Sequence, residues 1–140
     1  QRQMCIRDRY KRGIFALDTA LFLHDLTDRT PHKFHMAFPY GYNTSSPKAA
    51  GILCSCKKEP YYSLGIALVD TPAGNTVWAY NAEKTLCEIL KPISHTDIQI
   101  ITDAFKRYAG RKDKNIPLLS EYAHQLRVEK RLRPYLEVLL

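Results

Sequence analysis

The sequence predicts an α+β domain in which about four mostly antiparallel strands, preceded by a short helix, are followed by a C-terminal pack of about four helices. Three observations predict this class. Before residue 81, apolar and polar residues alternate in several short stretches, which is typical of strands. After residue 81, apolar residues recur three and four positions apart, which is typical of helices. A chain of 140 residues that is 45% hydrophobic and 25% charged suits one globular core.

We predict that the domain covers residues 10–140. The first nine residues, QRQMCIRDR, have no periodicity that continues into the following segment. We therefore expect residues 1–9 to be a non-native leader, and Cys5 carries no information about the fold.

The first predicted element is a short helix within KRGIFALDTALFLHDLTDRTP. Leu17, Ala20, Leu21 and His24 fall on one helical face, and the polar stretch before Pro31 ends the helix. Ala16 stands where a side-chain oxygen would cap the helix, so we expect this N-terminus to have no side-chain cap.

Two alternating stretches predict the first strands. In KFHMAF every second side chain is apolar, which predicts a half-buried strand. In ILCSC the same alternation places Ile52, Cys54 and Cys56 on one face, so we interpret both cysteines as core residues. The apolar face of the earlier strand consists of Phe34, Met36 and Phe38.

A β-hairpin is predicted after them. Leu64, Ile66 and Leu68 alternate along its first strand, and the turn-forming sequence Pro-Ala-Gly-Asn joins the two strands. Trp78 and Tyr80 share one face of the return strand, which leads directly into the helical half.

Capping residues and prolines divide the second half into helices. Asn81 and Asn115 are predicted N-caps, Ser94 with Asp97 resembles a capping box, and Pro134 is predicted to kink or split the last helix. The predicted inward-facing residues are Thr85, Leu86, Ile89 and Leu90; Ile98, Ile101, Ala104, Phe105 and Tyr108; Leu119, Tyr122, Ala123 and Leu126; and Val128, Leu132, Tyr135, Leu136 and Leu139.

Histidines and cysteines are candidate metal ligands, but their spacing is unfavourable. His32 and His35 are three residues apart, so on a strand they point to opposite faces and do not share one ion. Cys54 and Cys56 belong to the predicted apolar face and lack two further ligands. We predict no metal site.

Catalytic patterns are also missing from the sequence. His24 and Asp25 are adjacent and point about 100° apart on a helix, and Cys87 lies among apolar helical residues. The sequence has no glycine-rich phosphate loop and no nucleophile elbow. We predict no catalytic residue, no cofactor-binding residue and no enzyme activity, and we rank a nuclease-like or nucleotidyltransferase-like enzyme last among the alternatives.

The net charge of +7 is concentrated in two basic clusters. Two interpretations remain open: solvated helix faces with local ion pairs, or a positive surface for nucleic-acid phosphates or another partner. The first basic cluster is Lys106, Arg107, Arg111, Lys112 and Lys114, and the second basic cluster is Arg127, Lys130, Arg131 and Arg133.

Several stretches, in order, resemble the AbiEi family of antitoxins from type IV toxin–antitoxin systems. They are GIFALDTALFLHDLTDRTPHKFHMAFPYGYN, VDTPAGNTVWAYNAEKTLCEIL, AFKRYAGRKDKN and LLSEYAHQLRVEKRLRPYLEVLL. The resemblance extends from about Tyr10 to Leu140 and is specific because the motifs occur in the same order. It implies the C-terminal antitoxin domain, with Lys11–Ile14 where that domain begins in the family.

The resemblance also implies a function. Such an antitoxin counters a nucleotidyltransferase-like toxin without a stable complex and assists repression of its own promoter through an N-terminal winged helix, which we expect to be missing here. The systems act in abortive phage infection, so we expect a bacterial, cytoplasmic protein with no membrane partner. The alternative is a nucleic-acid-binding module that acts through the basic clusters.

Overall fold

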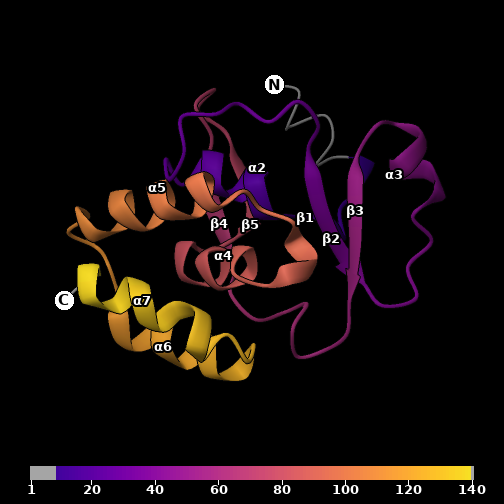
Figure 1. Ribbon diagram of the computed structural model, residues 1–140. Coiled ribbons are helices and arrows are strands. Elements are labelled where there is room, and N and C mark those ends of the chain that lie inside the picture. The colour runs from indigo at the N-terminus through magenta and orange to yellow at the C-terminus, as the bar shows by residue number, and fades with distance from the viewer. Residues whose placement is uncertain (1–8, 140) are drawn as a thin grey trace.

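The computed structural model describes residues 9–139 and has the predicted α+β class (Figure 1). Five strands form one sheet with the order β3-β2-β1-β5-β4. The strands are β1 (Ile14–Phe15), β2 (His35–Pro39), β3 (Leu53–Lys57), β4 (Ile66–Asp70) and β5 (Thr76–Tyr80). Apart from Arg9, the predicted leader lies outside the described residues, as does Cys5.

The central strand β1 was not predicted as a strand. It has only two residues, too few for an alternating pattern, and the sequence placed it beside the first helix. It pairs antiparallel with β2 and parallel with β5, while β2 pairs parallel with β3. Since β4 pairs antiparallel with β5, two of these four strand pairs are antiparallel and two are parallel, so the sheet is mixed rather than mostly antiparallel. The crossover that contains α3 (Ser45–Ala49) returns the chain parallel to β2.

Both faces of the sheet centre are buried. Phe15, Met36 and Phe38 belong to a hydrophobic cluster on one face, whereas Ala37 and Tyr80 belong to a cluster on the other. The prediction of a half-buried β2 is wrong, since Met36, Ala37 and Phe38 are each 0% exposed. A central strand covered on both sides loses the alternation that marks a half-exposed strand.

The short first helix and the four C-terminal helices occur in the predicted order along the chain. The helix α2 (Leu17–Leu23) precedes β2, and four longer helices pack together in the second half (Figure 1). These are α4 (Ala82–Ile89), α5 (Ile98–Ala109), α6 (Ile116–Gln125) and α7 (Glu129–Leu139), with a 3-10 turn, η1 (Pro92–Ser94), after α4.

The central helix of this pack is α4, and all eight of its residues are buried. The sequence predicted an amphipathic helix with Thr85, Leu86, Ile89 and Leu90 inward. The structure confirms that these four are buried, but it also buries the charged side chains of Glu83, Lys84 and Glu88.

Most of the predicted helix boundaries are confirmed. The Ala16 N-cap makes no side-chain hydrogen bond, whereas Asn81 Oδ1 accepts from Lys84 N at 2.8 Å and Asn115 Oδ1 accepts from Leu118 N at 3.1 Å. Asp97 is itself the N-cap of α5 rather than part of a capping box with Ser94. Helix α7 continues through Pro134, so that proline does not split it.

Two residues predicted to face the core, Cys56 and Ile98 (63% exposed), lie at the surface. Leu68 (58% exposed) and Trp78 (42%), which were predicted only to lie on apolar strand faces, are exposed as well. Leu68 pairs with Trp78 beside the edge of the sheet, about 7 Å along the strands from the covered Tyr80.

Candidate functional site

The first basic cluster is largely engaged in contacts within the domain. Arg107 Nε donates to Asp103 Oδ2 at 2.9 Å, and Arg111 donates to both carboxylate oxygens of Asp113 at 2.8 Å. Arg111 Nη1 also donates to the carbonyl oxygen of His24 at 2.8 Å. Lys114 Nζ donates to the carbonyl oxygen of Ala109 at 3.0 Å, near the end of α5.

These contacts give the first basic cluster a structural role. Arg111 joins the end of α5 to the end of α2, and Lys114 satisfies a terminal helix carbonyl. The remaining two cations, Lys106 and Lys112, are exposed. Of the five cations, Arg107 and Arg111 form the local ion pairs of the first interpretation.

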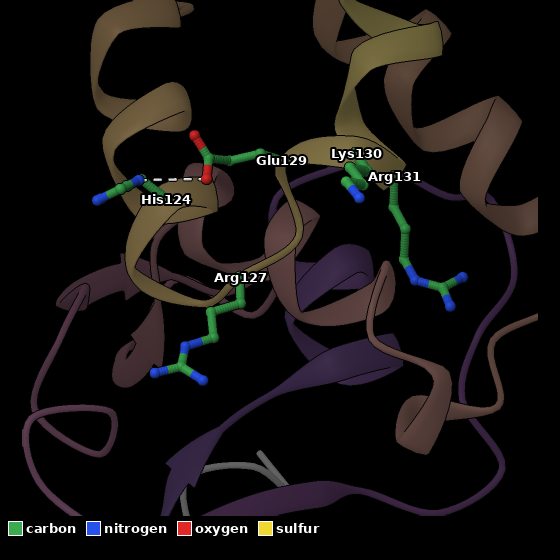
Figure 2. A pocket seen from close by; sticks show the side chains of 5 residues that line it. All are labelled: His124, Arg127, Glu129, Lys130 and Arg131. Carbon is green, nitrogen blue, oxygen red and sulfur yellow. Dashed lines mark hydrogen bonds and ion pairs between the residues drawn. The ribbon is translucent and has the colours of Figure 1, made fainter.

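The second basic cluster lies at and after the turn between α6 and α7, and Figure 2 shows three of its residues, Arg127, Lys130 and Arg131. Its four cations are exposed and form no ion pair or hydrogen bond through their side chains with any residue in the range 9–139. An open hollow of about 690 Å³ lies at this turn. It is lined by His124, Arg127, Glu129, Lys130 and Arg131.

The hollow has a net positive charge. Glu129 is its one lining carboxylate, and Glu129 Oε1 lies 3.2 Å from His124 Nδ1 (Figure 2). Both of these side chains are more than half exposed, so their contact contributes little to stability. Three cations and this one carboxylate line the hollow.

The two basic clusters do not form one surface. The first precedes α6 and the second follows it, so the ten residues of α6 separate Lys114 from Arg127 by about 15 Å. In Figure 1 the chain enters α6 and leaves it at opposite ends of the α6–α7 pair. Their electrostatic roles must therefore be considered separately.

A buried charged network under α4 was not predicted. Glu88 Oε1 lies 3.0 Å from Lys57 Nζ and 3.2 Å from Lys84 Nζ, and Glu88 Oε2 accepts a hydrogen bond from Lys57 at 3.2 Å. Glu88 Oε1 receives no well-oriented hydrogen bond, so its two contacts are ion pairs. The exposed fractions of Lys84 and Glu88 are 0% and 5%.

Lys84 connects this network to the loop before β4. Its ammonium group donates to the carbonyl oxygens of Tyr61 at 2.8 Å and Leu64 at 3.0 Å, and lies 3.8 Å from the ring centroid of Tyr80. Burial lowers the pKa of Lys84 to about 8, although the Glu88 carboxylate opposes this shift. The amine therefore fixes loop, helix and sheet to one another.

A second buried contact joins three helices. Tyr108 OH donates to Glu83 Oε2 at 2.6 Å and accepts from Asn115 N at 2.7 Å. Burial, followed by the hydrogen bond to Glu83, raises the pKa of Tyr108. Tyr108 is thus a core residue, as is Tyr122, which is 8% exposed.

His35 and His24 make polar contacts within the fold. His35 Nε2 lies 3.2 Å from Ser55 Oγ, and burial together with the nearby Lys57 charge lowers the pKa of His35 to about 4. His24 Nε2 lies 2.7 Å from the carbonyl oxygen of Tyr80, so this nitrogen carries the proton. Burial lowers the pKa of His24.

The cysteines differ in environment. Cys54 is half-buried beside the sheet core, whereas Cys56 is exposed, which corrects the prediction that both fill the core. Cys87 is fully buried, and burial raises the pKa of its thiol to about 12. In residues 9–139 no group of three or more His, Cys, Asp or Glu side chains is placed to hold a metal ion.

Within the described chain, no helix has both the length and the apolar composition needed to cross a bilayer. Comparison with protein-family models gives no match to this chain, and no curated protein is significantly similar to it.

Proposed function

We propose that this chain is the antitoxin domain of a type IV toxin–antitoxin pair of the AbiEi kind. It counters a nucleotidyltransferase-like toxin in the bacterial cytoplasm, and it does so by binding rather than by catalysis. When joined to a winged helix it assists repression of its own promoter. The proposal rests on the ordered sequence resemblance and on the way the resembling stretches pack.

The packing of the resembling stretches is the observation that carries the proposal. Phe15 of the first stretch pairs with Ala79 of the second in the sheet. Arg111 of the third stretch donates to the His24 carbonyl of the first. The resembling stretches therefore share one sheet and contact one another, which is consistent with their forming one domain of the family they resemble.

The test is growth rescue. The 140-residue chain is expressed from one inducible promoter and the nucleotidyltransferase-like toxin encoded beside it from another. We expect the chain to restore growth when the toxin is induced, while an unrelated domain of similar size and charge does not.

Failure of the chain to restore growth, in cells where immunoblotting shows it to be soluble and abundant, would overturn the proposal. Rescue by the unrelated basic domain would overturn it as well, because general positive charge would then explain the effect.

A further inference from the structure

We propose that the hollow at the α6–α7 turn binds the phosphate groups of single-stranded RNA. The residues assigned to phosphate are Arg127, Lys130 and Arg131, and the His124 ring is assigned to an unpaired base. This inference deepens the proposed antitoxin function, on which its biological meaning rests. It would give the antitoxin a means of shielding a nucleic-acid acceptor from the toxin.

The first step in the argument is the availability of these cations. Arg127, Lys130 and Arg131 are exposed, and none has a side-chain ion pair or hydrogen bond within the part of the chain that the structure describes. Arg107 and Arg111, at the other end of α6, are held by carboxylates. Unpaired guanidinium groups are the side chains that most readily bind phosphate.

The second step is the position of the cations. Lys130 and Arg131 lie in the first turn of α7, where the partial positive charge of the helix end disfavours cations. Arg127 has a positive φ of 61°, at the position after the α6 C-cap where glycine is usual. Lys130 and Arg131 thus carry charge where a helix end disfavours it, and Arg127 lies at the same turn, so a bound anion would offset the concentration of positive charge there.

The third step is the shape of the site. Proteins that read duplex DNA commonly insert a projecting helix or β-ribbon into a groove. Here the cations instead line an open hollow of about 690 Å³. A nucleic-acid strand can lie in such a hollow, whereas the hollow itself cannot be inserted into a DNA groove. Single strands bind in positive grooves in which bases stack on flat side chains. His124, with its side chain 76% exposed, offers such a ring.

The test is fluorescence-anisotropy titration of the whole chain with a labelled single-stranded 20-nucleotide RNA. Its variant is Lys130→Ala/Arg131→Ala, and its charge-matched control is Lys106→Ala/Lys112→Ala. We expect the variant to weaken RNA binding by on the order of tenfold and the control to change it less than twofold. Losing two phosphate contacts should also reduce the slope of log affinity against log salt by about 1.4.

A second variant, Arg127→Gly, keeps the turn geometry and should also weaken RNA binding several-fold. Circular dichroism must show native folding for each protein. Equal losses in variant and control would overturn the proposal, as would unchanged binding in the variant. Tighter binding of a 20-base-pair DNA duplex, or of ATP alone, than of the RNA would also overturn it.

The binding assay contains no toxin, so its outcome is separate from the growth-rescue result. RNA binding that fails alongside normal rescue would remove this site and leave the antitoxin proposal standing. Normal RNA binding without growth rescue would remove the antitoxin proposal and leave the RNA-binding site standing.

Discussion

The buried charges under α4 and the exposed charges at the α6–α7 turn serve the molecule in opposite ways. Inside, Lys57 and Lys84 both form ion pairs with the Glu88 carboxylate, and Lys84 also donates to two loop carbonyls. Outside, Arg127, Lys130 and Arg131 outnumber the one lining carboxylate. Buried charge must be partnered within the fold, whereas unpaired exposed charge is available to another molecule.

The largest effect should come from breaking the buried network. Glu88→Ala leaves the fully buried Lys84 and the partly buried Lys57 without their carboxylate. We expect a loss of about 3–5 kcal/mol in the free energy of unfolding, measured by urea denaturation. Glu129→Ala, which removes an exposed carboxylate at the turn, should change that free energy by less than about 0.5 kcal/mol. Similar small losses in both variants would mean that burial does not distinguish the two regions.

The next effect is a loss of stability in acid through His35. Its folded-state pKa of about 4 lies below the unfolded value of 6.5, so the folded state resists protonation. The stabilisation is fully present above pH 6.5 and is lost as the pH falls toward 4, by up to roughly 3 kcal/mol. Urea denaturation at several pH values should show a flatter profile for His35→Gln than for the wild type. Profiles that remain parallel between pH 6.5 and 4 would contradict this assignment.

Gly65 tests how closely the loop packs on Lys84. A Cβ atom at Gly65 would lie 2.7 Å from Lys84 Cβ, and the residue has a φ of +83°. Gly74 has nearly the same φ, +86°, with no atom within 4 Å of such a Cβ, so Gly74→Ala measures the backbone cost alone. We expect Gly65→Ala to cost about 1–3 kcal/mol more than Gly74→Ala in thermal or urea unfolding. Equal losses would show that Lys84 moves aside without penalty.

Sequence periodicity predicted the helices well, because α5, α6 and α7 each have one covered face and keep a clear three-to-four spacing. It failed where an element is covered on all sides. The strand β1 is too short to show a pattern. For α4 the spacing predicted only the apolar inward face, although its charged residues are buried as well. The spacing of Lys84 and Glu88, four residues apart, was the one signal for their ion pair.

Sequence-based prediction had a similar limit at the candidate site. The sequence identified both basic clusters but could not show which cations are paired within the fold, because the partners of the first basic cluster are set by tertiary structure. Arg111 donates to His24 O, 87 residues away in sequence. Only the placement of α2 beside the end of α5 distinguishes an arginine that holds the fold together from one that remains available.

The smallest effect has the opposite sign and concerns Arg127. Its left-handed backbone suits glycine, so Arg127→Gly should raise the free energy of unfolding by about 0.5–1 kcal/mol, after the entropy that glycine adds to the unfolded chain. Arg127→Ala removes the same charge but keeps the backbone strain, and should give no such gain. Comparing the two variants by urea denaturation separates the effect of the backbone conformation on stability from the effect of the charge. Destabilisation by Arg127→Gly would mean that the Arg127 side chain supports the fold. The turn would then resemble the buried network, whose charges stabilise the fold, and would not be a surface left available to another molecule.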